Sequence, residues 1–368
     1  MAFTVLSDND VKHILRTLTQ EDTASLVQAL QDAMVTYSCK DEQQHQPHRA
    51  VVTRPDGQVS LFMPATTEQS VGVKIVGVAP ASKLKTSDPS AAPPPALRSA
   101  LTLCDAEGQA IGVLNAAELT AFRTALGSML LFRLRRDAEN IVVFGAGKQA
   151  LWHTRLAVIL QGDKIKKITV VNRSQQRIKE LFDSLRGEPD APWPPHISLE
   201  AFDDEKGDLQ GLVQEADALF CTTPATSPLF PASFLSSEEA RRKSRFISAI
   251  GSYRLDMAEI DPELLKDVVD GSGSFVEQVW EGHITVDSRD GCLQEAGELV
   301  SAGIDPKKML EVGNIFEEGK ISPAHKEWLE SGFVIYKSVG VGVMDIAVGK
   351  ALLQLAQSKN VGVSLESF

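Results

Sequence analysis

The segment from Ile141 to Ala150, IVVFGAGKQA, constrains the fold of this chain more than any other feature. Its apolar start predicts a buried strand, and the GxGxxA pattern that follows predicts a tight turn into a helix. Gly145 permits the turn, and Gly147 lets the backbone approach a pyrophosphate, which the first amides of the helix can bind. The segment therefore predicts a Rossmann-type dinucleotide-binding domain. The expected coenzyme-binding loop consists of Gly145, Ala146, Gly147, Lys148 and Gln149.

Further apolar runs after this loop support the same domain. They cover residues 168–171, 218–221 and 246–250. Continuous apolar runs are typical of parallel strands that are buried on both faces. Because the carboxyl ends of such strands line the ligand crevice, we expect Thr222, Thr223 and Gly251 to face the nicotinamide half of the coenzyme.

The residues after the second strand of this domain predict which coenzyme it prefers. NAD-binding sites usually place Asp or Glu there, to accept a hydrogen bond from the ribose 2′-hydroxyl. This chain instead has Asn172, Arg173 and Ser174, with Arg177 one helical turn later. A guanidinium and a hydroxyl can hold a 2′-phosphate, which a carboxylate would repel. We therefore expect NADPH or NADP rather than NAD.

The first hundred residues predict a different, α+β architecture. We expect one helix from Asp8 to about residue 36, then strands near 49–54, 58–63, 71–78 and 97–104, with a Pro-Asp-Gly hairpin turn at 55–57. A helix that begins at Asn115 leads into the dinucleotide-binding domain, and a last helix covers about 343–358. Two proline-rich segments, 79–96 and 187–196, are expected to be surface loops.

Composition limits the possible functions and compartments. The 368 residues include 37 Lys plus Arg and 49 Asp plus Glu, so the net charge of −12 argues against nucleic-acid binding. Because the acidic N-terminus does not resemble a secretory signal and no long apolar run is present, we expect a cytoplasmic protein without a membrane partner. The four cysteines are far apart and form no CxxC pair, so neither a disulfide framework nor a zinc site is predicted.

Three basic residues are candidates for binding a small anionic substrate. Lys74 is the only charged residue between Glu68 and Lys83, in the apolar run VGVKIVGV. An ammonium in such a strand is unfavourable without a partner or ligand, and the alternative is an edge-strand lysine that prevents aggregation. Arg49 stands at the head of the first hairpin strand. Arg123, beside Thr124, is placed to reach either a phosphate or a substrate.

Taken together, these residues resemble the ornithine cyclodeaminase and μ-crystallin family, over most of the chain. The resemblance rests on Arg49, Lys74, LTAFRTA at 119–125, the GAGKQA loop, NRS at 172–174 and DPELL at 261–265. It implies a homodimer of an α/β protein. It further implies that a Rossmann NADP-binding domain (residues 123–334) is inserted in an α+β substrate-binding and dimerisation domain (residues 1–122 and 335–368). It also implies that Arg49 and Lys74 bind the carboxylate or imine region of the substrate, with Arg123 close to both the substrate and the coenzyme. Thr124 is expected to bind the coenzyme.

One residue departs from the pattern of the ornithine cyclodeaminases. These enzymes have an acid/base aspartate after a strand that ends in a Gly pair, and Tyr253 stands at that position here. Tyrosine, with a reference pKa of about 10, is a poor base near neutral pH. This loop is more similar to the ketimine-reductase branch, which favours NADPH-dependent reduction of an imino acid with Lys74 as the proton donor. Two alternatives remain: an oxidative cyclodeaminase or amino-acid dehydrogenase, and a non-catalytic NADPH-dependent binding protein.

Overall fold

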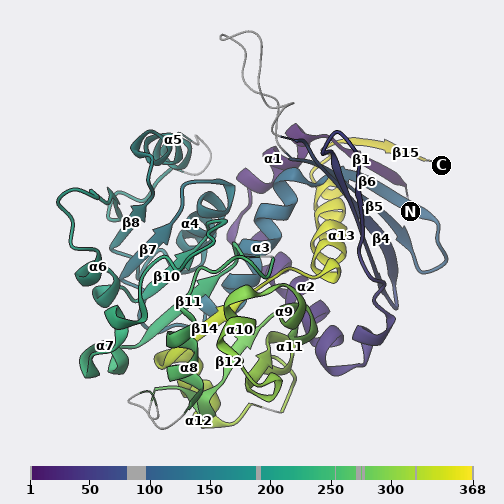
Figure 1. The fold of residues 1–368 in the computed structure, drawn as a ribbon. Coiled ribbons are helices and arrows are strands. Elements are labelled where there is room, and N and C mark those ends of the chain that lie inside the picture. The colour runs from purple at the N-terminus through teal and green to yellow at the C-terminus, as the bar shows by residue number, and fades with distance from the viewer. Residues whose placement is uncertain are drawn as a thin grey trace. The chain divides into compact units, whose positions relative to one another are not determined.

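The computed structural model describes residues 2–80, 97–187, 192–252, 254–270, 275, 278–319 and 321–366. It divides into two compact units (Figure 1). One contains the residues up to Arg123 and those from Gly342 onward, and the other is the continuous segment Thr124–Val341. Most of the predicted loop at 79–96, part of that at 187–196, and Tyr253 lie outside the described residues.

The first unit is built on a sheet of seven described strands, ordered β15-β1-β6-β5-β4-β3-β2. All neighbouring pairs are antiparallel except β1 and β6. Helix α13 (Gly342–Ser358) packs on β3, β4 and β5, and α2 (Gln20–Cys39) packs on α13. The strands are β1 (Phe3–Leu6), β2 (Ala50–Thr53), β3 (Val59–Thr67), β4 (Ser70–Val78), β5 (Leu97–Asp105), β6 (Ala110–Asn115) and β15 (Val363–Leu365).

Strand β4 shows how the sequence pattern orients this sheet. Its residues alternate, so that Ser70, Gly72, Lys74 and Val76 are buried whereas Val71 and Ile75 are exposed. Successive side chains of a strand point to opposite faces, so Lys74 points to the face that α13 covers. The four strands predicted in this region, and the last helix, are confirmed.

The prediction of a single N-terminal helix is wrong, because two helices form there. Helix α1 (Asp8–Arg16) begins at a capping box of Ser7 and Asp10, and α2 begins at a second capping box of Thr19 and Asp22. In each box the cap side chain and the acid satisfy backbone N–H groups that a helix start leaves unpaired. Because apolar residues recur on both sides of residues 17–19, the sequence pattern alone does not reveal this interruption.

The second unit is built on a parallel sheet, as predicted, and helices cover both of its faces. Phe220 packs on Phe132 and His153 on one face, whereas Leu219 and Cys221 belong to the apolar core on the other. The described strands are β7 (Asn140–Phe144), β8 (Lys167–Val171), β9 (Ser198–Ala201), β10 (Ala218–Cys221), β11 (Arg245–Ala249), β12 (Ile284–Val286), β13 (Met309–Glu311) and β14 (Phe333–Lys337). The helices are α3 (Ala116–Phe132, which begins in the first unit), α4 (Lys148–Gln161), α5 (Gln175–Arg186), α6 (Leu209–Glu215), α7 (Glu238–Arg242), α8 (Pro262–Asp270), α9 (Arg289–Glu295), α10 (Gly297–Ala302), α11 (Val312–Ile315) and α12 (Pro323–Ser331).

The strand order of this sheet, β13-β12-β14-β11-β10-β7-β8-β9, identifies its ligand-binding edge. The chain runs outward from β7 through β8 to β9, and then returns to pair β10 with the other side of β7. The order therefore reverses between β7 and β10, and ligands of such sheets bind beyond the carboxyl ends at this point. Among the described residues, no helix has the length and apolar character needed to cross a bilayer.

Candidate active site

The turn from β7 into α4 has the geometry that the glycine pattern predicts. Gly145 has a φ of +110°, which disfavours any residue with a Cβ, and its N–H donates to the carbonyl of Val171 at 2.8 Å. A Cβ at this position would lie 2.7 Å from Oγ1 of Thr222. This hydroxyl donates in turn to the carbonyl of Phe144, also at 2.7 Å. The end of β7 is thus tied to the ends of both β8 and β10, and only glycine fits there.

Gly147 is the opposite case, because the space beside it is open. It is the N-cap of α4, and a Cβ there would meet no described atom within 4 Å. Ala146 and Gln149 are half-buried and Lys148 is exposed. Within the described part of the chain, Oε1 of Gln149 is buried without a hydrogen-bond partner. The backbone N–H groups at this open helix start can donate to the diphosphate of a dinucleotide coenzyme.

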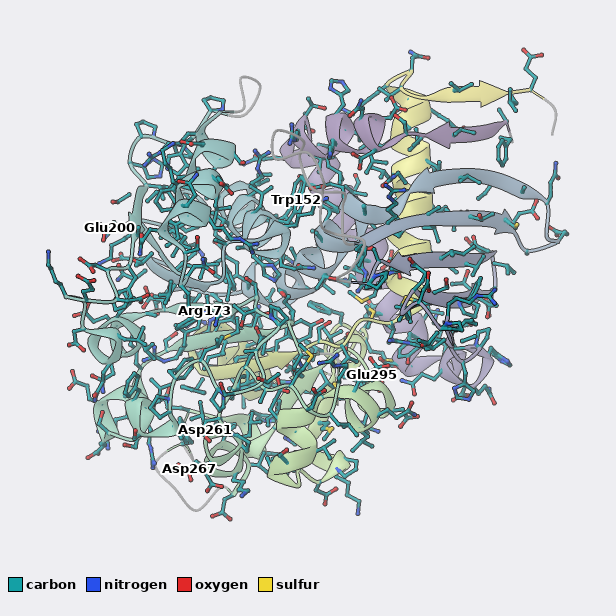
Figure 2. All side chains as sticks on the ribbon, turned by 45° about the horizontal axis from the view of Figure 1, so that its top comes forward. Trp152, Arg173, Glu200, Asp261, Asp267 and Glu295 are labelled. Carbon is teal, nitrogen blue, oxygen red and sulfur yellow. The ribbon has the colours of Figure 1, made fainter. Side chains whose placement is uncertain are left out.

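The loop after β8 holds the residues predicted to select the coenzyme. Arg173 and Arg177 are exposed, and Figure 2 labels Arg173 just beyond β8. Ser174 caps α5, with its Oγ accepting from the N–H of Arg177 at 3.4 Å. The side-chain amide of Asn172 donates to the carbonyl of Ser174 at 3.1 Å. Asn172 and Ser174 therefore shape this loop, and the two guanidinium groups lie at its surface.

A buried carboxylate that the sequence analysis missed joins the loops after β10 and β11. Oε1 of Glu259 accepts from the backbone N–H of Thr223, and Oε2 from that of Gly251, both at 2.6 Å. Glu259 is fully buried, and this burial raises its pKa to about 7. Gly251 must be glycine, because a Cβ would lie 2.0 Å from the carbonyl oxygen of Thr223. Nothing in the sequence distinguishes Glu259 from other acidic residues in loops that precede helices.

A second buried group lies beside this carboxylate. Lys337, at the end of β14, donates to the carbonyl of Ser252 at 3.0 Å and lies 3.2 Å from Oε1 of Glu298. The hydroxyl of Ser252 also donates to Glu298. Asp287, at the end of β12, accepts from Ser338 Oγ and from the N–H of Gly340. Buried polar groups thus hold the loops at the carboxyl edge of the sheet.

In the first unit, Lys74 and Arg123 meet at a carboxylate on α13. Oδ2 of Asp345 lies 2.7 Å from Nζ of Lys74, and Oδ1 lies 3.0 Å from Nε of Arg123. Lys74 and Asp345 are each 1% exposed and Arg123 is 4% exposed. Because β4 lies between β3 and β5, the alternative of an edge-strand lysine is wrong.

The charges of this cluster shift the pKa values of its members. Burial lowers the pKa of Lys74 to about 8, and the charges of Arg123 and Arg49 also lower it, whereas Asp345 raises it. Burial would raise the pKa of Asp345, but Arg123 and Lys74 hold it below its ordinary value. Arg49 precedes β2, level with Lys74 across the sheet, so the structure brings all three predicted cations into one electrostatic group. Thr124 follows Arg123 in α3 and is buried.

Asp345 was also missed in the sequence, although a signal was present. It is the only acid in helix α13 and follows three uncharged residues at the start of that helix, and Lys74 is the only charge in its strand. The argument that an isolated buried charge needs a partner applies to both residues. Among the described residues, two buried cations share this one carboxylate, which leaves positive charge to attract a further anion.

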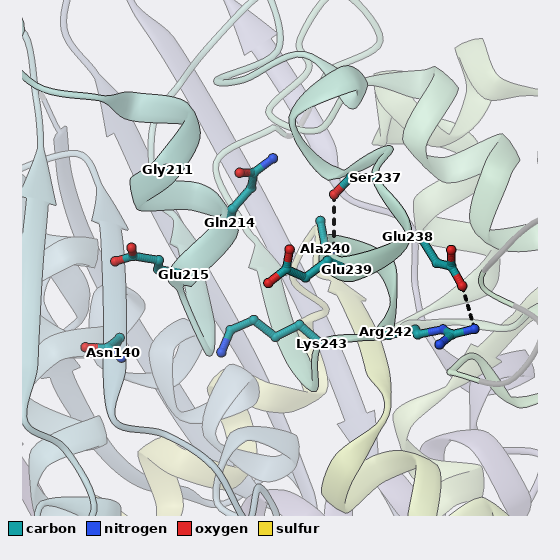
Figure 3. A pocket seen from close by; sticks show the side chains of 10 residues that line it. All are labelled: Asn140, Gly211, Gln214, Glu215, Ser237, Glu238, Glu239, Ala240, Arg242 and Lys243. Carbon is teal, nitrogen blue, oxygen red and sulfur yellow. Dashed lines mark hydrogen bonds and ion pairs between the residues drawn. The ribbon is translucent and has the colours of Figure 1, made fainter.

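A hollow of about 1100 Å³ lies elsewhere in the second unit (Figure 3). Asn140, which starts β7, lines it together with Lys243 and residues of α6 and α7. It is therefore at the amino edge of the sheet, opposite to Gly145. Ligands of parallel sheets bind at the carboxyl edge, so we do not assign the coenzyme to this hollow.

Several known proteins are similar to this chain in sequence. The sequence profile of the ornithine cyclodeaminase/mu-crystallin family matches residues 7–360. An uncharacterized protein of Saccharomyces cerevisiae is 24% identical, over 97% of this chain and 98% of its own length. A Delta(1)-pyrroline-2-carboxylate reductase of Bacillus cereus is 26% identical, over 83% of this chain and 84% of its own. The ketimine reductase mu-crystallin of Macropus fuliginosus is 23% identical, over 88% and 90%.

A solved structure shows the same fold. Delta(1)-pyrroline-2-carboxylate reductase of Thermococcus litoralis, in complex with NADH and L-proline, matches with a TM-score of 0.72 at 18% identity. The match covers 98% of this chain and 99% of that one.

Proposed function

The chain belongs to the ornithine cyclodeaminase/mu-crystallin family, and from this membership we propose that it is an NADPH-dependent reductase of a cyclic ketimine or related imino acid. The relatives from Bacillus cereus and Macropus fuliginosus are named as reductases of a pyrroline carboxylate and of ketimines, which carry C=N bonds. The chain is accordingly an oxidoreductase that acts on C=N bonds with a nicotinamide coenzyme. The preference for NADPH and the nature of the imino acid are the finer parts of the proposal.

The single observation that carries the proposal is the pair of buried cations on one carboxylate. The two positive charges of Lys74 and Arg123 outnumber the single negative charge of Asp345. A buried excess of positive charge is unfavourable until an anion binds. The carboxylate of an imino acid supplies this anion. We assign its binding to Arg123 and Arg49, because a guanidinium offers two parallel donors that match a carboxylate. Binding at two points also fixes the orientation of the C=N bond.

Lys74 is the proposed acid. Reduction of a C=N bond adds a hydride to carbon, which the coenzyme supplies, and a proton to nitrogen, which the chain must deliver. Burial brings the pKa of Lys74 to about 8, close to the working range of a general acid at neutral pH. Asp345 keeps the ammonium protonated and directs it. After the proton leaves, Lys74 is neutral, and the cost of its burial is smaller.

For the coenzyme, the second unit offers the loop from Gly145 to Gln149, with Thr222, Thr223 and Gly251 at the neighbouring strand ends. The exposed guanidinium groups of Arg173 and Arg177 support the preference for a 2′-phosphate, because no carboxylate stands at the residues directly after β8.

A homodimer is the proposed assembly, and the outer face of the first sheet supports it. Val5, Phe62, Val71, Ile75 and Val363 all lie on this face and are 37–61% exposed. A contiguous exposed apolar face is unfavourable in water and is typical of an interaction surface. The family resemblance implies that this unit is the dimerisation domain.

The proposed function is tested by coenzyme oxidation. Purified protein is mixed with NADPH or NADH and with five- and six-membered cyclic imino acids. The same rings without the carboxylate serve as matched controls. We expect oxidation of NADPH with the carboxylated rings and little with the controls. Ammonia release from ornithine and NADP⁺, without imine reduction, would support the cyclodeaminase alternative. Coenzyme binding without turnover on any imine or amino acid would support the binding protein.

A further inference from the structure

Glu259 lies where the two loops proposed to face the nicotinamide ring come together. Its carboxylate spans the ends of β10 and β11 and accepts one backbone N–H from Thr223 and one from Gly251. The hydroxyl of Thr223 adds a third, longer contact at 3.3 Å. A backbone N–H can only donate, so each contact requires a carboxylate oxygen that accepts. Both oxygens of Glu259 are thus committed to the two loops.

The backbone around Glu259 fixes this carboxylate in place. Its own carbonyl accepts from the N–H of Leu229, and Ala258 donates to the carbonyl of Ala225. The segment before α8 therefore runs beside the segment after β10 and cannot shift independently of it. The carboxylate is shielded from solvent, since Glu259 is fully buried. It therefore acts on a ligand through the loops that it holds.

We propose that Glu259 is a positioning residue of the coenzyme site, whose carboxylate ties the loop after β10 to the loop after β11 so that both face the nicotinamide half together. This inference rests on the proposed function, which assigns Thr223 and Gly251 to the coenzyme. The ligand is a reduced or oxidised nicotinamide dinucleotide. A protonated Glu259, or a glutamine there, offers one acceptor in place of two, so one loop loses its tie and coenzyme affinity falls.

The ionisation of Glu259 gives this role a signature in pH. Its pKa is raised to about 7, chiefly by burial, and the titratable groups that face it are Lys337 from β14, Glu298 from α10 and the thiol of Cys221 from β10. Lys337 lowers this pKa and Glu298 raises it. The carboxylate is ionised above about pH 7 and protonated below it. Coenzyme binding is therefore expected to weaken as the pH falls from 8 to 6.

Asp217 provides a matched control at the other edge of the same sheet. This buried carboxylate precedes β10 and accepts from the N–H of Asn140 at the start of β7, at 2.9 Å. It also pairs with Lys243 at 2.6 Å, and both Asn140 and Lys243 appear in Figure 3. Asp217→Asn removes a carboxylate that joins two strands, as Glu259→Gln does, but it does so far from the proposed coenzyme loops.

The test measures binding of NADPH and NADH, without substrate, to the full chain at pH 6 and pH 8. At pH 8 we expect Glu259→Gln to bind coenzyme at least about tenfold more weakly than wild type, the loss expected for one hydrogen bond to a charged group. We expect Asp217→Asn to bind as wild type does, even if its melting temperature falls. Wild-type affinity falls between pH 8 and pH 6, and the affinity of folded Glu259→Gln changes less.

Three results would overturn the inference. The first is that Glu259→Gln binds coenzyme with wild-type affinity at both pH values. The second is that coenzyme affinity changes equally with pH in wild type and in Glu259→Gln, which would assign the pH dependence to the coenzyme phosphate. The third result concerns the wild-type protein and applies even if Glu259→Gln does not fold. NADH has no phosphate that titrates between pH 6 and pH 8, so a wild-type affinity for NADH that is the same at both pH values would also overturn the inference. These results would leave the proposed function intact. A wild-type protein that binds neither coenzyme would overturn both.

Discussion

Oδ2 of Asp345 lies 2.7 Å from Nζ of Lys74, in an ion pair that joins helix α13 to strand β4 in the buried part of the first unit. The two residues are separated by 271 positions in the sequence. Arg123 binds the other oxygen of the same carboxylate, so the pair is part of a cluster with more positive than negative charge. The charge balance of this cluster leads to the first prediction.

Asp345→Asn is expected to shift the pH dependence of imine reduction. The carboxylate raises the pKa of Lys74, which lies at about 8, so its removal lowers this pKa. A proton donor acts in its protonated form, so the wild-type rate is expected to fall as the pH rises through about 8. In Asp345→Asn the fall begins at a lower pH. Rates of NADPH oxidation from pH 6 to pH 9 measure this, and an unshifted profile in a folded variant would remove Lys74 as the acid.

Lys74→Met is expected to lower turnover by about 10²–10⁴-fold, the usual contribution of a general acid. The substitution keeps the volume of the side chain, and Asp345 remains paired with Arg123. NADPH binding is expected to stay close to that of wild type, because the coenzyme loops belong to the other unit. Steady-state rates and a coenzyme titration test both parts. An unchanged kcat would contradict the assignment.

The two glycines of the coenzyme loop are expected to respond differently to alanine. Gly145→Ala places a Cβ at a φ of +110° and 2.7 Å from Thr222, and is expected to cost about 1–3 kcal/mol of unfolding free energy. Gly147→Ala meets no described atom within 4 Å, so its stability is expected to fall less than that of Gly145→Ala, by the cost of alanine at a helix N-cap. Its affinity for NADPH is expected to fall, because the Cβ occupies the approach of the diphosphate. Denaturant unfolding and coenzyme titration separate the two effects. Wild-type NADPH affinity in Gly147→Ala would place the coenzyme elsewhere.

Arg173→Ala is expected to reduce the preference for NADPH over NADH by about ten- to a hundredfold, the range for a lost hydrogen bond between charged groups. Arg173 is exposed, so the fold is expected to be unaffected. Arg186→Ala, at the other end of α5, removes an exposed arginine of the same region and is the matched control. The ratio of kcat/KM for the two coenzymes is the readout. A wild-type enzyme that prefers NADH would refute this prediction at the outset.

Ile75→Glu is expected to convert the proposed homodimer into a monomer. Ile75 is 42% exposed on the outer face of the first sheet, so the fold tolerates a charge there, whereas a dry interface does not. Val300, an equally exposed aliphatic residue on α10 in the second unit, provides the control Val300→Glu. Sedimentation velocity gives the mass of each. A monomeric wild-type protein, or a dimeric Ile75→Glu, would show that this face is not the interface.

Much of the fold was predictable from local pattern. The apolar runs at 141–144, 168–171, 218–221 and 246–250 correspond to β7, β8, β10 and β11, since a strand buried on both faces must be apolar throughout. The strands β1, β6, β9 and β12 to β15 were not predicted. Several of these are three or four residues long, and their pairing depends on neighbours that are distant in sequence.

Lys74 could be found because it is the only charge in an apolar segment, whereas the choice of Arg49 and Arg123 rested on their positions and on the family resemblance. Their partners could not be found in this way. Glu259 is one acid among several in its loop, and its importance arises from two backbone N–H groups that follow other strands. Asp345 was detectable as the only acid in helix α13, but its pairing with Lys74 is a consequence of how α13 packs on β4. The places where buried charges meet are therefore the part that required the structure.

Transfer of deuterium from the coenzyme to the substrate would show directly whether the protein reduces a C=N bond. Wild-type protein is incubated with NADPH deuterated at the transferable position of the nicotinamide ring and with a cyclic imino acid, and the amino-acid product is analysed by mass spectrometry. We expect a product one mass unit heavier, with the deuterium on the former imine carbon, and almost none of this product from Lys74→Met. An unlabelled product, or no product while NADPH binds tightly, would contradict it.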